Sequence, residues 1–148
     1  MSRVSIAGFE MTILDYEFPE IQAGHPFSYD ANWLVVEAKI NSNDGFIHLK
    51  PEPCLLTTEL ADFVRQLECF IKPQSHRRWQ ANLQPMEPYL ELHVEQDEET
   101  GLIVGAQIRV DSGRTIQQLK MQWDITQQQL ETLFEQCKQA IREFPVKG

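Results

Sequence analysis

The chain has 148 residues, of which 42% are hydrophobic and 24% are charged, and its formal net charge is -9. This composition excludes a disordered chain and supplies enough residues for one core, so we expect residues 1–148 to form a single domain. The negative charge disfavours binding to nucleic acid and favours a basic protein as partner.

The sequence also bears on where the protein works. No apolar run approaches the roughly 20 residues of a membrane span. Acidic residues interrupt the N-terminal segment before the apolar region of a signal peptide develops. The three cysteines show no disulfide or zinc-knuckle spacing. Together these features predict a cytoplasmic protein that does not bind a membrane.

In the first half of the chain, apolar residues recur at every second position and then at helical spacing. The predicted elements are a strand with Phe9, Met11 and Ile13, strands at 29–40 and 45–50, and a helix at 57–71. Thr57 or Thr58 can cap this helix, and Pro73 stops it. The segment 18–29, with its prolines and aromatic residues, is predicted as a long irregular loop.

The second half repeats this order of elements. Strands are predicted at 89–96, 102–111 and 115–125, and a helix at 126–144 begins with a Thr126–Gln129 capping box. Residues 72–88 are predicted as a second irregular segment. A shift of 70 residues aligns the two halves, including the apolar positions of both helices. A duplicated strand–strand–helix unit and a chance agreement of common patterns are both open interpretations.

The order strands, helix, strands, helix favours the α+β class. We expect a two-layer fold in which a mostly antiparallel sheet carries both helices on one face. An edge strand of such a sheet could pair between subunits, so the oligomeric state stays open.

No set of residues in the sequence defines a catalytic or metal site. The four histidines lack metal-ligand spacing, and the phosphate-loop, dinucleotide and hydrolase motifs are missing. We therefore predict no enzymatic activity, no cofactor and no metal site. Cys137 lies on the apolar stripe of the last helix and is predicted to be a core residue.

Acidic residues crowd the hairpin between the strands at 89–96 and 102–111. They are Glu95, Asp97, Glu98 and Glu99. Like charges this close repel one another in the free protein. Two interpretations are open: a solvated turn, or an anionic patch for a cationic partner. The basic stretch HRRW at 76–79 could bind a phosphate or an acidic group, and we prefer to interpret it as exposed surface.

Trp33 lies on the side of its strand that should face water, because it alternates with Leu34 and Val36. One interpretation is that Trp33 anchors the loop at 18–29. The other is that it binds a partner, since tryptophans are favoured where interfaces are energetically dense.

Two short segments carry a family resemblance. Residues 30–34 read DANWL and residues 56–60 read LTTEL, and both follow the segment DYEFPE at 15–20. This order resembles the WapI-type bacterial immunity proteins, in which a D-x-N-W-L strand precedes an L-T-x-E-L helix. The resemblance implies a non-enzymatic protein that binds and occludes a secreted toxin domain inside the producing cell. It does not say which residues touch the toxin.

In this interpretation Asp30 satisfies backbone donors where the loop enters the strand, and Glu59 suits the positive end of the helix dipole. We expect the hairpin carboxylates at 95–99 to contact a cognate, basic toxin domain, with Trp33 as a further anchor. The alternative is a small-molecule-binding module with a ligand cleft between the 18–29 loop and the sheet near Trp33.

Overall fold

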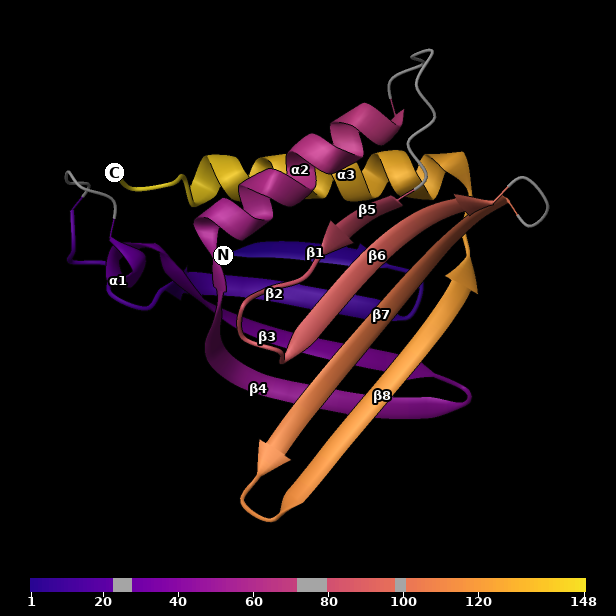
Figure 1. Cartoon of the computed structure of the whole chain (residues 1–148), viewed down its shortest axis with the longest axis horizontal. Helices are drawn as coiled ribbons and strands as arrows, with labels where there is room; N and C mark the ends of the chain where they lie inside the picture. Colours follow the sequence, from indigo (N-terminus) through magenta and orange to yellow (C-terminus); the bar gives the residue numbers. More distant parts are fainter. Residues whose placement is uncertain (23–27, 72–79, 98–100) are drawn as a thin grey trace.

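The computed structural model describes residues 1–22, 28–71, 80–97 and 101–148, which form two four-stranded sheets and three helices (Figure 1). The first sheet has the order β1 (Ser2–Ile6), β2 (Phe9–Tyr16), β3 (Trp33–Ser42), β4 (Gly45–Leu56). The second has the order β5 (Gln80–Leu83), β6 (Leu90–Asp97), β7 (Gly101–Ser112), β8 (Thr115–Asp124). The helices are α1 (Tyr29–Asn32), α2 (Thr57–Ile71) and α3 (Gln127–Glu143). Every strand pairing is antiparallel, so the fold is of the α+β class that the sequence predicts.

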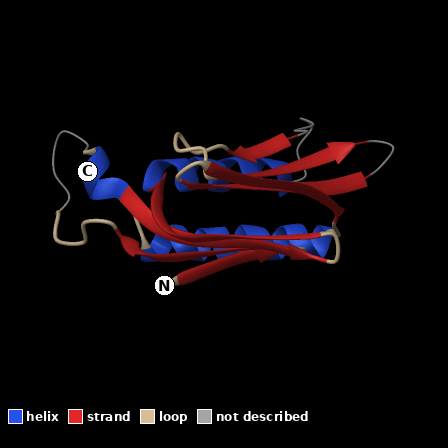
Figure 2. Cartoon of the chain, turned by 90° about the horizontal axis from the view of Figure 1, so that it is seen from below, coloured by secondary structure: helices blue, strands red, loops and turns tan. Residues whose placement is uncertain are grey.

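The two sheets lie one over the other as two layers (Figure 2). Each sheet is a meander in which every strand pairs with the next one along the chain. The chain leaves the first sheet through α2 and begins the second with β5, so the strands divide into two sheets. The sequence missed β1 and also β5, within the segment 72–88 predicted as irregular, because each short strand owes its conformation to pairing with its neighbour. The strand predicted at 29–40 is wrong over its first four residues, which form α1.

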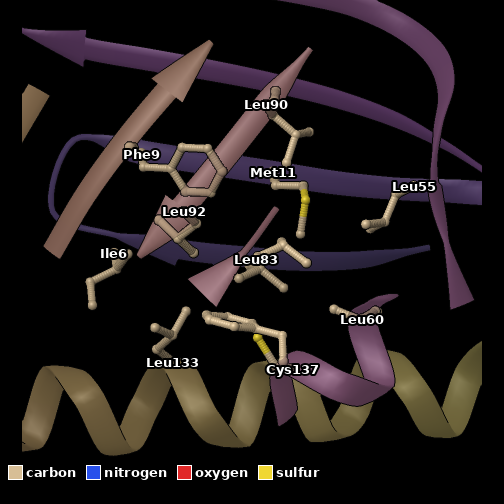
Figure 3. Packing of buried hydrophobic residues seen from close by; sticks show 14 of the residues in the cluster. Ile6, Phe9, Met11, Leu55, Leu60, Leu83, Leu90, Leu92, Leu133 and Cys137 are labelled. Atoms are coloured by element: carbon tan, nitrogen blue, oxygen red, sulfur yellow. The ribbon is translucent and has the colours of Figure 1, made fainter. Parts of the chain in front are cut away.

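The core lies between the two sheets and is closed by α2 and α3. In β3, Leu34, Val36 and Ile40 are fully buried, as their alternation predicts. Burial of each such side chain stabilises the fold by about 1.5–3 kcal/mol relative to its exposure. Both sheets and both long helices contribute to this one cluster (Figure 3), as the following side chains show: Phe9, Met11, Leu60, Leu90, Leu92, Leu133 and Cys137. Cys137 is thus a core residue, as predicted.

The two long helices lie together on one side of the molecule (Figure 1), and each packs beside the first strand of the other half's sheet. The α3 helix lies beside β1, where the side-chain oxygen of Gln136 accepts the backbone N–H of Ser5 at 2.9 Å. The α2 helix lies beside β5, where Gln66 accepts the N–H of Asn82 at 2.8 Å and donates to its carbonyl at 3.2 Å. The helices therefore satisfy backbone groups at the outer edges of β1 and β5.

This arrangement bears on the suggested duplication. Both halves run through four meander strands and then a helix, in the same order. Gln66 and Gln136, which make corresponding contacts on opposite sheets, are 70 residues apart, the offset that aligns the sequence. The shared strand order agrees with a duplicated unit, and duplication stays a prediction.

The two helices begin in different ways. Thr126 and Gln129 form the predicted capping box at the start of α3, with hydrogen bonds of 2.8 and 3.1 Å. At the start of α2, the carboxylate of Glu59 accepts the N–H of Leu56 at 2.8 Å. The hydroxyl of Thr57 instead donates to Asn32. None of the described helices combines the length and the apolar character needed to cross a bilayer.

Candidate functional site

The acidic hairpin predicted from the sequence is formed by β6 and β7. Glu95 is half-buried in β6, between Gln80 and Ile103 on the neighbouring strands. Asp97 is the last residue of β6 and pairs with Gly101, whose φ of 80° is favoured by glycine at this turn. Glu98 and Glu99 lie outside the described residues. The structure thus places Glu95 and Asp97 on one strand approaching the turn.

Trp33 is the first residue of β3 and is half-buried. Its carbonyl accepts the N–H of Glu17 at 2.8 Å, which ties the chain after β2 to the start of β3. Helix α1, which immediately precedes Trp33, lies at the opposite end of the molecule from the point where β6 ends and β7 begins (Figure 1). The structure therefore does not bring Trp33 and the acidic hairpin together. Part of the 18–29 loop, residues 23–27, lies outside the described residues.

The fold assembles a second acidic surface that the sequence did not predict. It surrounds the half-buried Tyr89 with Glu52 of β4, Glu87 of the β5–β6 connection and Asp111 of β7. The charge of Glu52, then partial burial, and then the charges of Asp111 and Glu87 raise the pKa of the Tyr89 hydroxyl above its ordinary 10.0. We call Glu52, Glu87, Tyr89 and Asp111 the Tyr89 cluster.

Arg109 joins Tyr89 and Asp111, two members of the Tyr89 cluster, through hydrogen bonds. The carbonyl of Tyr89 accepts the N–H of Arg109 at 2.8 Å, and the Arg109 side chain donates to Asp111 at 3.1 Å. The side chain of Met86, in the same connection as Glu87, is 62% exposed. No local signal could have identified this cluster, because its acidic members are separated by more than 20 residues and meet only where the two sheets cross.

The larger described cavity, about 540 Å³, lies between α2 and β5 and is lined by polar side chains: Glu59, Asp62, Arg65, Gln66, Asn82 and Gln84, with Cys69 beside them. Its carboxylates already have partners within the protein. Glu59 accepts the N–H groups of Leu56 and Met86, and Asp62 accepts from Arg65 and Gln66. Such groups serve the fold rather than a ligand. A second cavity of about 300 Å³ lies at the start of α3. Trp33 lines neither of these two cavities.

Two of the cysteines are unsuited to act as nucleophiles. Burial, and to a smaller extent the charges of Glu52, Glu59 and Glu87, raise the pKa of Cys54 to about 12. Burial raises the pKa of Cys137 to about 12 as well. Both therefore remain protonated thiols at neutral pH. Within residues 1–22, 28–71, 80–97 and 101–148, no three histidine, cysteine or acidic side chains are grouped to hold a metal ion.

The DANWL and LTTEL segments meet in the structure through Asn32. Its side-chain oxygen accepts the Thr57 hydroxyl at 2.6 Å and the N–H of Lys147 at 2.8 Å. Its amide group donates to the carbonyls of Ser28 and Lys147 at 2.9 and 2.8 Å. Asn32 is completely buried, whereas Asp30 is exposed. Asn32 and Thr57 therefore hold the two segments together inside the fold.

Comparison with known proteins gives one result that bears on this site. Searches of curated proteins and of solved structures found no significant match. The family model described as the immunity protein WapI-like family matches residues 3–145, nearly the whole chain. The matched region includes both sheets, the three described helices and the Asn32–Thr57 hydrogen bond. The chain belongs to the WapI-like immunity protein family.

Proposed function

We propose that the protein is a non-enzymatic immunity protein that binds a cognate secreted toxin domain and blocks it in the cytoplasm of the producing cell. The observation that carries this proposal is the family match over residues 3–145. Immunity proteins of this kind act by binding a protein, and the described cavities offer no apolar cleft next to Trp33. Membership therefore supports inhibition by protein–protein contact.

The contact surface that we propose is the acidic hairpin with Glu95, Asp97, Glu98 and Glu99. A toxin that acts on nucleic acid needs a basic cleft, and an acidic inhibitor can mimic the charge of the substrate. The net charge of -9 favours approach to such a cleft. Carboxylates near a hairpin end are well placed for this role, because a hairpin can enter a cleft that a flat surface cannot.

The Tyr89 cluster is the second acidic surface, and an experiment can separate the two. The partner is first isolated with the tagged protein from its native lysate, with washes at low and high salt. A toxin domain lost at high salt supports electrostatic binding, and one retained at high salt moves the contact to apolar anchors such as Trp33. A bound metabolite without a protein partner would instead favour the small-molecule module.

Association kinetics with the isolated toxin then locate the surface. The variant Asp97→Asn, Glu98→Gln, Glu99→Gln should associate roughly 10-fold more slowly and with a weaker salt dependence. The matched control is Glu52→Gln, Glu87→Gln, Asp111→Asn, which removes the same charge from the Tyr89 cluster. Slower association in the control alone would move the contact to that cluster. In the variant Trp33→Ala, lost affinity with unchanged thermal stability would place Trp33 in the interface.

A further inference from the structure

The two sheets have four edge strands, β1, β4, β5 and β8, and the outer edges of these strands are protected in different ways. The edges of β1 and β5 are covered by α3 and α2, whose Gln136 and Gln66 bind the backbones of Ser5 and Asn82. The edge strand β4 is interrupted by Pro51 and by Pro53, and its pairing with β3 shifts register twice. Prolines, bulges and covering helices are the means by which natural sheets prevent pairing with another chain.

The remaining edge strand, β8, lacks these protections within the described structure. It runs through ten residues, Thr115–Asp124, without proline, and its pairing with β7 shows no register shift. No residue of β8 is buried, whereas every other described strand has buried residues. In Figure 1, β8 forms the outer border of the second sheet, with only β7 beside it. A regular, exposed edge of this length is a template for strand addition.

The side chains of β8 indicate what would pair with it. Leu119, Met121 and Trp123 are half-buried and pack against the core. The alternate residues Gln118, Lys120 and Gln122 lie on the opposite, exposed side, where Lys120 is the one charged residue of the three. A strand added at this edge needs apolar residues on the side that faces the core and polar residues on the exposed side. A copy of β8 has this pattern. A twofold axis perpendicular to the sheet would place the same sides of both copies together.

The charge around β8 also favours a second copy of this chain. Strand β8, Thr115–Asp124, contains one basic and one acidic residue, a local charge of zero, in a chain whose net charge is -9. Two copies of an acidic protein therefore repel each other less at β8 than at their carboxylate-rich surfaces. A basic partner, in contrast, is attracted to those acidic surfaces and not to β8.

We propose that two copies of the protein associate through β8, with the strands antiparallel, so that the second sheets of both copies become one continuous sheet. The acidic hairpin and the Tyr89 cluster are not part of this contact. The inference stands independently of the proposed immunity function.

The experiment is sedimentation equilibrium of the full-length chain over a series of concentrations. The variant Gln118→Lys, Gln122→Lys adds two like charges to the exposed side of β8, where they would face their counterparts in the second copy. We expect a concentration-dependent dimer for the unchanged protein and a dissociation constant raised roughly 10-fold or more for the variant. The matched control, Gln128→Lys, Gln139→Lys, makes the same charge change at exposed positions of α3 and should leave the dimer unchanged.

Thermal melting of each variant shows whether it is folded, and amide hydrogen exchange reports on β8 itself. Slower exchange in β8 at higher protein concentration supports the pairing. The proposed dimer is overturned if the protein is a monomer at every concentration. It is also overturned if the lysine pairs in β8 and in α3 weaken the dimer equally, or if the β8 variant leaves the dimer intact. Protection of β8 that arises only on adding another protein overturns self-association in favour of a partner's strand.

Discussion

At the scale of single residues, Asn32 uses all of its hydrogen-bonding capacity. Its two amide hydrogens reach the carbonyls of Ser28 and Lys147, and its oxygen accepts from Thr57 and from the Lys147 backbone. One buried side chain thus joins α1, the start of α2 and the segment after α3. Lys147 is held further by its ammonium group, which lies 3.8 Å from the centre of the Tyr16 ring.

Replacing Asn32 should therefore destabilise the protein strongly. In Asn32→Ala, the Thr57 hydroxyl and the backbone groups of Lys147 lose their partner in a buried site, and we expect a loss of about 2–4 kcal/mol. The measurement is the free energy of unfolding from urea titration. Asp30→Ala is the matched control in the same motif, and because Asp30 is exposed we expect a change within about 0.5 kcal/mol. Equal effects of the two changes would contradict this account of the motif.

The cysteines predict both a labelling pattern and a pH dependence. Cys54 and Cys137 are buried, and their pKa values are raised to about 12, whereas Cys69 is exposed. A thiol-alkylating reagent at mildly alkaline pH should modify Cys69 alone in the folded protein and all three cysteines after unfolding, as mass spectrometry can show.

The same pKa values fix the sign of the pH effect on stability. Above the ordinary thiol pKa of 9.0, the unfolded chain loses thiol protons that the folded chain keeps. The free energy of unfolding should therefore fall as the pH rises from 9 toward 12. Replacement of both buried cysteines by alanine lowers stability overall but should flatten this decline. An unchanged slope in that variant would show that other groups cause it.

At the scale of elements, the helices do more than cover the core. Gln66 and Gln136 bind backbone groups of β5 and β1 and so replace part of a neighbouring strand. The α2 helix, from the first half of the chain, thereby covers the edge of the second sheet. The α3 helix, from the second half, covers the edge of the first sheet. A glutamine suits this task, because its amide offers both a donor and an acceptor in one plane.

Removing these glutamines should open the covered edges. We expect Gln66→Ala to lower the free energy of unfolding by about 1–3 kcal/mol and Gln136→Ala by about 1 kcal/mol, since Gln66 makes more hydrogen bonds to its strand. Amide exchange at Asn82 and Ser5, respectively, should become faster. Gln139→Ala, at an exposed position of α3, serves as the control. Normal protection at Asn82 in the first variant would mean that the contact does not hold the edge.

At the scale of the whole molecule, the two halves depend on each other. One apolar cluster includes residues of both sheets and both long helices, and the helices are exchanged between the halves. Neither half can then bury its own helix and protect its own first strand without the other. This is the physical basis for the expectation that the chain is a single domain.

Tryptophan fluorescence tests that expectation. Trp33 lies in the first sheet, and Trp123 lies in the second sheet with its ring beside Gly8 of the β1–β2 turn. Each can be observed alone once the other tryptophans are replaced by phenylalanine. We expect the two reporters to unfold at the same denaturant concentration, with one cooperative transition. Far-ultraviolet circular dichroism of both variants gives the midpoint for loss of secondary structure, with which each fluorescence midpoint is compared. Two separated midpoints would contradict a single cooperative unit and indicate independent halves.

Features that depend on neighbouring residues could be predicted from the sequence alone. Alternation in 34–40 identified the buried side of β3, helical spacing located α2 and α3, and Thr126 with Gln129 identified a helix start. The α+β class followed from the order of these elements. The DANWL and LTTEL segments also pointed to the family that the comparison shows.

Features that depend on residues far apart in the chain became visible only in the folded structure. The Asn32–Thr57 bond, the Tyr89 cluster and the glutamine contacts join segments that no local pattern relates. The strand β5 is too short to be recognised without β6, and the division into two sheets depends on which edges the helices cover. Periodicity shows which side of a helix or strand is apolar, but the packing of the whole chain determines which other element covers that side.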